Sequence, residues 1–283
     1  MISMFNAGDK IAVDSFTYTN FKGLANFLHI QLISVESDEF GMSPHYLMQT
    51  CKNAEIKGIY LMPTCSNPAS VFMPAFRRQE IADIAHKFQL LLIEDDIYSF
   101  LAPNGVKSFF SILPEQTVHI CSVSKSLCAG LRVAFLAFPA KYREILVAGM
   151  LNINLKTVSM NGEIVAELIE SGTALNIVRQ KIALAERRNT IFKSVFDVPK
   201  RDNIARFFFW LPLPEHLTSE EMELLALQKG VHILGSHRFA MQNEQKSSYI
   251  RVSVTSPDTE DDLRKGLMIL KNICRDSTVN VIV

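Results

Sequence analysis

The chain has 283 residues, 48% of them apolar, so it can bury a substantial core. Lysine plus arginine and aspartate plus glutamate number 29 each, and a formal charge of zero argues against direct binding of nucleic acid. Five scattered cysteines without C-x-x-C spacing argue against a disulfide framework and a metal site and favour the cytoplasm, and no stretch approaches the ~20 apolar residues of a membrane span.

Strand-like and helix-like segments alternate from the start of the chain. Residues 10–16 and 31–36 have strand patterns, and residues 20–29 between them can form a helix. Ser43 and Pro44 mark the start of a further helix, with a capping serine and a proline at the first helical position. This alternation predicts strands connected by helical crossovers.

Two nearly continuous apolar runs follow, at residues 56–62 and 90–93, and they are typical of strands covered on both faces. Residues 77–88 between them place apolar side chains at helical spacing. Together these segments predict an α/β fold with a mostly parallel sheet covered by helices. The second run ends in Asp95 and Asp96, at the carboxyl end of the strand, where open α/β sheets bind ligands.

The second half of the chain changes character near residue 197. Residues 139–196 are predicted to be largely helical, whereas residues 207–214 form an aromatic strand with an abrupt proline stop. A capping box at Thr218 to Glu221 starts a helix, and strands are predicted at residues 231–234 and 249–254. We therefore predict a large domain at 1–196 and a small α+β domain at 197–283.

The most informative stretch is residues 121–139, where a short buried strand gives way to a turn that contains Lys125. An amine at the edge of an apolar sheet and near a second cation can have its pKa lowered enough to attack a carbonyl group. Ser122 and Arg132 supply a hydroxyl and a guanidinium of the kind that binds phosphate. The combination suggests a bound phosphorylated aldehyde, although a surface turn before a strand is the simpler alternative.

The pattern Ser122-x-Ser124-Lys125 followed by Gly130-x-Arg132 resembles that of fold-type I pyridoxal-phosphate (PLP) enzymes. It is most similar to class I/II aminotransferases near the 2-aminoadipate and kynurenine aminotransferases. It equally resembles the aminotransferase-type domain that MocR regulators of the GntR family carry behind a DNA-binding domain. The resemblance implies a PLP-transferase fold in which Lys125 is the Schiff-base lysine, Ser122 and Arg132 hold the cofactor phosphate, and Ser124 lies in the same site.

The same resemblance assigns roles to five further residues. Tyr18 would stack on the cofactor ring, and Asn67 and Tyr98 would contact its phenolic oxygen. Asp95 would pair with the pyridine nitrogen and keep it protonated, which makes the cofactor an electron sink. Arg251 would receive the substrate carboxylate through a bidentate contact, with Asn67 also near the substrate.

Taken singly, each of these residues has a simpler interpretation. Tyr18 could cap a strand, and Asn67 with Pro68 is a common turn. Asp95 and Asp96 could be a strand-end cap or part of a metal site, and Arg251 could form an ion pair at a sheet edge.

The resemblance implies transfer of an amino group between an amino acid and a 2-oxo acid, by a homodimer. The family's phosphate-binding Gly/Ser-Gln loop lies further upstream than the 17 residues that precede Tyr18, so we expect an N-terminally truncated site that holds PLP weakly. The alternatives are an effector-sensing domain of a MocR-type regulator without its DNA-binding domain, or an inactive remnant.

Overall fold

The computed structural model describes residues 1–198, 204–241 and 248–275. The chain divides into two compact units, Met1–Asn67 with Val71–Arg179 and Pro68–Ser70 with Gln180–Val283. The predicted domain boundary at 196/197 lies just after helix α8 (Thr173–Val195), and as a boundary it stays a prediction. Within the described ranges, no helix is long and apolar enough to cross a bilayer.

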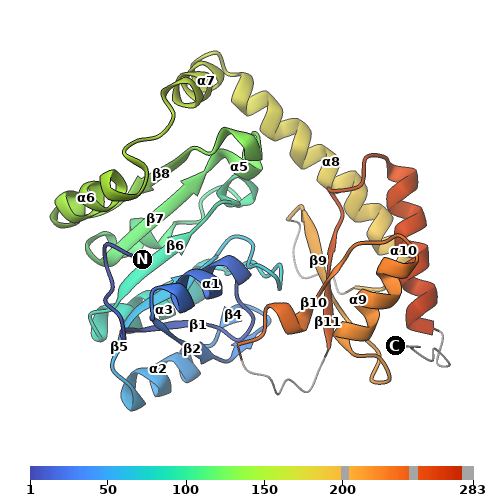
Figure 1. Cartoon of the computed structure of the whole chain (residues 1–283), viewed down its shortest axis with the longest axis horizontal. Helices are drawn as coiled ribbons and strands as arrows, with labels where there is room; N and C mark the ends of the chain where they lie inside the picture. Colours follow the sequence, from blue (N-terminus) through green and yellow to red (C-terminus); the bar gives the residue numbers. More distant parts are fainter. Residues whose placement is uncertain (199–203, 242–247, 276–283) are drawn as a thin grey trace. The chain divides into compact units, whose positions relative to one another are not determined.

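A six-stranded sheet forms the centre of the first unit, in the order β2-β1-β5-β6-β7-β8 (Figure 1). The strands from β2 to β7 in this order are parallel, and β8 is antiparallel to β7. The prediction of a mostly parallel sheet is therefore confirmed. The strands are β1 (Lys10–Asp14), β2 (Gln31–Val35), β5 (Ile56–Leu61), β6 (Leu91–Asp95), β7 (Thr117–Ser122) and β8 (Ala134–Ala137), and β3 (Ser37–Asp38) pairs with β4 (Gly41–Met42).

One face of this sheet packs against α2 (Pro44–Asn53), α3 (Ala75–Lys87) and α4 (Phe109–Ile112). The side chains between these layers are apolar and almost completely buried, which follows from the apolar runs in the central strands. The buried cluster includes Ala12, Ile59, Leu61 and Leu92 from the strands and Leu47, Ile81, Ala85 and Phe109 from the helices.

The other face of the sheet contacts α1 (Thr19–Phe27) and the N-terminal segment. Phe21 of α1 stacks on Tyr60 of β5, with ring centroids 3.7 Å apart. At Gly58, a Cβ atom would lie 2.7 Å from the Leu91 carbonyl oxygen and 2.8 Å from the Phe5 ring, so glycine is required there. The central strands β5 and β6 are therefore covered on both faces, as their apolar runs predicted.

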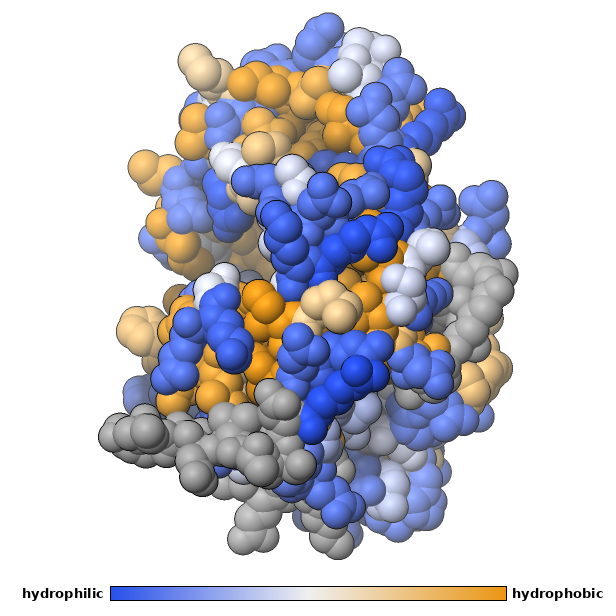
Figure 2. All heavy atoms as spheres, turned by 90° about the vertical axis from the view of Figure 1, so that its right-hand side faces the viewer, coloured by the Kyte–Doolittle hydropathy of each residue, from blue (hydrophilic) through white to orange (hydrophobic). Residues whose placement is uncertain are grey.

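The remaining helices of the first unit follow β7. The short helix α5 (Val123–Ser126) and the turn after it lead into β8, then into α6 (Arg143–Asn154), α7 (Ser159–Glu170) and the start of α8. Many apolar side chains of these elements are exposed, and Figure 2 shows apolar side chains on the surface of the upper part of the view. From β8 to α7, the exposed apolar residues are Phe135, Leu136, Ile145, Val147, Met150, Leu151, Ile153, Leu155, Val158, Met160, Ile164 and Ile169.

The second unit contains an antiparallel sheet in the order β10-β11-β9. Its core joins this sheet to α9, α10 and the last turns of α8, where Phe192 stacks on Phe209 at 3.9 Å between centroids. The elements are β9 (Phe208–Pro212), β10 (Leu234–Gly235), β11 (Tyr249–Ser253), α9 (Ser219–Gln228) and α10 (Glu260–Arg275).

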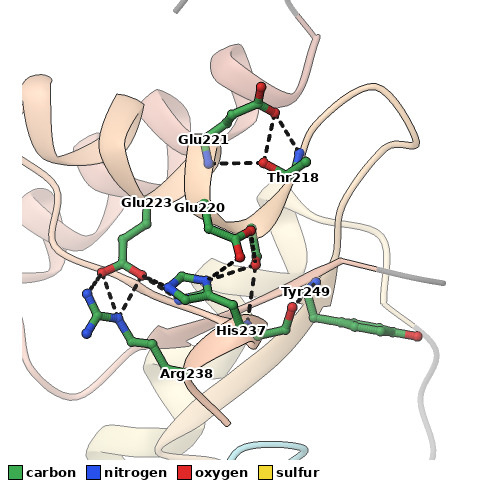
Figure 3. Close-up of polar contacts among 10 residues, drawn as sticks. Thr218, Glu220, Glu221, Glu223, His237, Arg238 and Tyr249 are labelled. Carbon is green, nitrogen blue, oxygen red and sulfur yellow. Dashed lines mark hydrogen bonds and ion pairs between the residues drawn. The ribbon is translucent and has the colours of Figure 1, made fainter. Parts of the chain in front are cut away.

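Three details of the predicted elements can be compared with the structure. The capping box is confirmed, because Thr218 and Glu221 exchange hydrogen bonds at the start of α9 (Figure 3). Ser43 occupies the cap position of α2 but makes no capping hydrogen bond with its side chain. The predicted strand 231–234 was too long: only Leu234 and Gly235 pair with β11, and the apolar pattern before them reflects burial of Ile233 in the core.

Candidate active site

Three predicted site residues lie at the carboxyl ends of three neighbouring strands. Asp95 ends β6 and Ser122 ends β7, while Asn67 follows β5 in the next loop. Because β5, β6 and β7 are parallel and adjacent, their carboxyl ends meet at one edge of the sheet. The structure therefore brings these three residues to a common edge.

Asp95 is a partly buried carboxylate with a specific partner. The Tyr60 hydroxyl donates to Asp95 Oδ2 at 2.7 Å. Burial raises the pKa of Asp95, whereas the Tyr60 hydrogen bond and the nearby His119 lower it. An anionic carboxylate at the end of a buried strand is suited to binding a protonated nitrogen.

Asn67 lies in a tightly held loop. The Val71 N–H donates to Ser66 Oγ and the Ser66 N–H donates to the Val71 carbonyl, both at 3.0 Å. The Asn67 amide oxygen is buried and has no hydrogen-bond partner among the described residues. Since an unsatisfied buried polar atom is costly, this amide is a candidate contact for a bound ligand.

Lys125 lies on the one-turn helix α5, directly after β7, and is exposed. Ser122 caps this helix, because its Oγ accepts from the Ser124 N–H at 3.2 Å. Ser122 also pairs with Ala134 across the β7–β8 ladder. Arg132 is two residues before Ala134, so Ser122 and Arg132 lie at the same end of these two strands.

Arg132 has a left-handed backbone conformation, with φ 51° and ψ 39°. A residue other than glycine adopts this conformation at some cost in energy, and such residues often occur at functional sites. The conformation ends the short 3-10 helix Ala129–Leu131 and turns the chain into β8. The exposed guanidinium is therefore held at the end of a constrained turn.

The two tyrosines predicted to contact the cofactor follow two of the strands. Tyr18 is partly buried at the start of α1, and its electrostatic effect on Tyr60 shows that it lies near the Tyr60–Asp95 pair. Tyr98 is buried, with 4% of its surface exposed, three residues after Asp95. Both tyrosines belong to the same unit as Lys125.

Arg251 belongs to the second unit, in the middle of β11. Its guanidinium stacks on the ring of Phe208 of β9, with the guanidinium carbon 3.9 Å from the ring centroid. Because β11 has β10 on one side and β9 on the other, Arg251 is not at a sheet edge. The planar group is thus supported on one face by an aromatic ring.

Polar contacts with α9 hold β10, the strand that pairs with β11 beside Arg251 (Figure 3). Glu223 accepts from the Gly235 N–H at 3.0 Å and forms an ion pair with Arg238. The Ser236 hydroxyl accepts from the Tyr249 N–H at 3.2 Å, which joins the same corner to the start of β11. These contacts fix the position of β10 against the strand that carries Arg251.

The sequence patterns did not reveal the partners of the strand-end carboxylates. Glu94 is completely buried and accepts from the Phe109 N–H at 2.8 Å, and its other oxygen lies 2.8 Å from His119 Nδ1. Asp96 is also buried and accepts from Thr64 Oγ1 at 3.0 Å. In the sequence, the signal that could have revealed such a partner is a single tyrosine or histidine within an otherwise apolar strand.

Comparisons with known proteins identify the family of the chain. The family model for aminotransferases of class I and II matches residues 1–267. An uncharacterised HTH-type transcriptional regulator of Bacillus subtilis, YdeF, is 35% identical over 98% of this chain. A 2-aminoadipate transaminase of Thermus thermophilus is 25% identical over 81% of this chain, and the matched regions cover 60% of each of these two relatives.

Solved structures agree on the fold. A kynurenine aminotransferase of Pyrococcus horikoshii, crystallised in complex with PMP, superimposes with a TM-score of 0.88 and 23% sequence identity. The superposition covers 99% of this chain and 72% of that protein. The chain therefore has the fold of these aminotransferases and belongs to the aminotransferase class I and II family.

Proposed function

We propose that this chain binds PLP and transfers an amino group between an amino acid and a 2-oxo acid. The observation that carries the proposal is the set of Asn67, Asp95 and Ser122 at adjacent strand ends, with Lys125 three residues beyond Ser122. This set combines an amine, a carboxylate and a hydroxyl at the edge where α/β sheets bind ligands. Membership of the aminotransferase family supports the same conclusion.

The residues present fit this cofactor. Asp95 is a carboxylate whose burial favours pairing with a protonated ring nitrogen, and the orphaned amide of Asn67 offers a hydrogen bond to a ring substituent. Ser122 and Arg132, at the same end of β7 and β8, supply a hydroxyl and a guanidinium for the phosphate. We assign Ser124 to the same group, because its backbone is fixed by the Ser122 cap.

When bound, PLP supplies an aldehyde and an electron-accepting ring. Lys125 Nζ would bond covalently to the aldehyde carbon with loss of water, and it would be released as a free amine when the substrate amino group takes its place at that carbon. The free amine would then move a proton from the amino-acid α-carbon to the aldehyde carbon. Asp95 would keep the ring nitrogen protonated, while Tyr18 would stack on the ring and Tyr98 would orient its phenolic oxygen. Each of these tasks uses a group that the chain supplies.

We assign substrate recognition to Arg251. A guanidinium offers two parallel N–H donors that match an α-carboxylate, which a lysine cannot reproduce. Stacking on Phe208 limits the orientations that the Arg251 plane can adopt. We propose 2-amino acids and 2-oxo acids as the substrate class, since both carry the carboxylate that this residue would bind.

The test is a spectroscopic titration of the purified protein with PLP. The wild type should develop an absorption band that Lys125→Ala abolishes. Lys141→Ala, which removes another exposed lysine of the same unit, should retain the band. If no Lys125-dependent band forms at saturating PLP, the proposal is wrong.

A second candidate function is effector sensing, and the 35% identity to an HTH-type regulator over 98% of this chain favours it. A sensing domain would bind PLP and an amino acid without releasing a new amino acid. Incubation with an amino donor and a labelled 2-oxo acid distinguishes the two: amino-acid product detected by mass spectrometry supports the enzyme, and a spectral change without product supports the sensor.

We also propose that the chain forms a homodimer. The apolar side chains exposed on β8, α6 and α7 support this, since monomeric proteins rarely leave so many together on their surface. Light scattering at increasing concentration should give twice the mass of the chain, and a monodisperse monomer would refute the proposal. The cytoplasmic location expected from the sequence stays a prediction.

A further inference from the structure

Tyr60 is a buried tyrosine in the strand next to the one that ends in Asp95. The register of the two parallel strands sets Tyr60 opposite Ile93. Because side chains alternate between the two faces of a strand, Ile93 and Asp95 share one face of the sheet, and Tyr60 lies on that face as well. The hydrogen bond of 2.7 Å from the Tyr60 hydroxyl to Asp95 Oδ2 follows from this register.

Packing holds the Tyr60 ring in place. Only 3% of its surface is exposed, and the ring stacks on Phe21 of α1 with an angle of 13° between the ring planes. Rotating the ring away from Asp95 would break this stacking and leave a buried hydroxyl without its acceptor. The donor is therefore aimed at one carboxylate oxygen by the fold itself.

The surroundings keep Tyr60 a neutral phenol, and its hydroxyl favours the ionised form of Asp95 against the effect of burial. Burial and the negative charge of Asp95 raise the pKa of Tyr60 well above its usual value, so Tyr60 keeps its proton. Electrostatic interactions with Tyr18 and Asp14 act on the pKa of Tyr60 in the same direction. Burial raises the pKa of Asp95, which Tyr60 and His119 oppose.

We propose that Tyr60 is a positioning residue: it donates to one oxygen of Asp95, keeps this carboxylate ionised and leaves the other oxygen for the ring nitrogen of the cofactor. This inference rests on the proposed function for the role of Asp95. Tyr60 would act on the cofactor only through Asp95, and it would select a ring that carries a protonated nitrogen.

The first test uses the full chain without cofactor. Tyr60→Phe keeps the ring that stacks on Phe21 and removes only the hydroxyl. Without this donor the pKa of Asp95 in the folded state rises further, and a carboxyl group with a raised folded pKa destabilises the fold as pH increases. The quantity to compare is the folding equilibrium constant of Tyr60→Phe divided by that of the wild type. We expect this ratio to be about ten times lower at pH 7 than at pH 4.

Two controls separate this effect from lost packing. Tyr46→Phe removes the same hydroxyl from a pair with Glu36 at the surface, and water replaces the lost donor there, so its effect should vary little with pH. Asp95→Asn removes the charge that Tyr60 is proposed to hold, so Tyr60→Phe should have a pH-independent effect in this background. An equal loss of stability at every pH, with or without Asp95, overturns the inference.

The variant could also fail to fold. If Tyr60→Phe does not fold but Tyr60→Phe with Asp95→Asn does, the uncompensated carboxylate is the cause, which supports the inference. If neither folds, Tyr60 acts through packing alone and the inference is overturned.

The second test compares PLP with its carbocyclic analogue, which has a C–H group in place of the ring nitrogen. We expect the wild type to bind PLP more tightly than the analogue, and Tyr60→Phe to reduce this preference about tenfold. An unchanged preference overturns the role toward the cofactor. If the wild type forms no Lys125-dependent band, the proposed function fails, while the titration without cofactor still decides whether Tyr60 holds Asp95 ionised.

Discussion

Asp96 offers a quantitative test of the buried polar contacts below the site. Only 4% of its surface is exposed, and burial raises its pKa from 3.8 to about 6, with the nearby Glu94 adding to the shift. The Thr64 hydrogen bond and the Arg78 charge oppose the shift without cancelling it. A difference of about two pKa units corresponds to about 3 kcal/mol of lost stability when the carboxyl group is fully ionised.

Because the pKa of Asp96 is higher in the folded state, the protonated group favours folding, and this contribution is lost as pH rises from 3.8 through about 6. Asp96→Asn should therefore have little effect near pH 3 and should raise the free energy of unfolding by about 2 to 3 kcal/mol near pH 7.5. This increase in the free energy of unfolding is smaller if the new amide N–H₂ group has no hydrogen-bond acceptor. Such a loss is expected at the position of Asp96 Oδ1, which has no partner among the described residues.

Urea unfolding followed by circular dichroism between pH 3 and 8 measures this difference. Asp83→Asn, on the exposed face of α3, is the matched control and should leave the pH profile unchanged. A loss of stability in Asp96→Asn at neutral pH would mean that the attraction between Asp96 and the Arg78 charge outweighs the cost of burial, and the reasoning would then be wrong.

Three further substitutions test the packing of the two units. Thr218→Ala removes the capping box of α9 and should cost about 1 kcal/mol in urea unfolding, whereas the non-capping Ser43→Ala should cost much less. Gly58→Ala should cost about 1 to 3 kcal/mol, because the new methyl group meets backbone 2.7 Å away, and an unchanged midpoint would refute the close approach. Arg188→Met leaves three carbonyl groups at residues 254–258 without their hydrogen-bond donor and should lower the free energy of unfolding by about 2 to 4 kcal/mol. Fluorescence of the single tryptophan, Trp210, reports the unfolding of the second unit. Unfolding of this unit at the wild-type urea concentration would contradict the last prediction.

The local elements were largely predictable from the sequence. The apolar runs and helical spacing predicted the central strands and α3 within one or two residues, because burial on both faces leaves a clear pattern. The strand ends at Asp95 and Ser122 followed from the same runs, since polar residues interrupt them abruptly. The strand predicted at 231–234 failed because burial in a core does not by itself require a hydrogen-bonded ladder.

Pairings between strands explain what the sequence could not predict. The contact of Tyr60 with Asp95 depends on the register that sets Tyr60 opposite Ile93, and a shift by one residue would turn the hydroxyl to the other face of the sheet. The same holds for Glu94 and His119, which are directly opposite each other across β6 and β7. A single sequence shows which side chains share a face of one strand, but it does not show how two strands align with each other. The residues expected to touch a ligand were therefore identifiable by type and position, whereas the residues that hold them needed the structure.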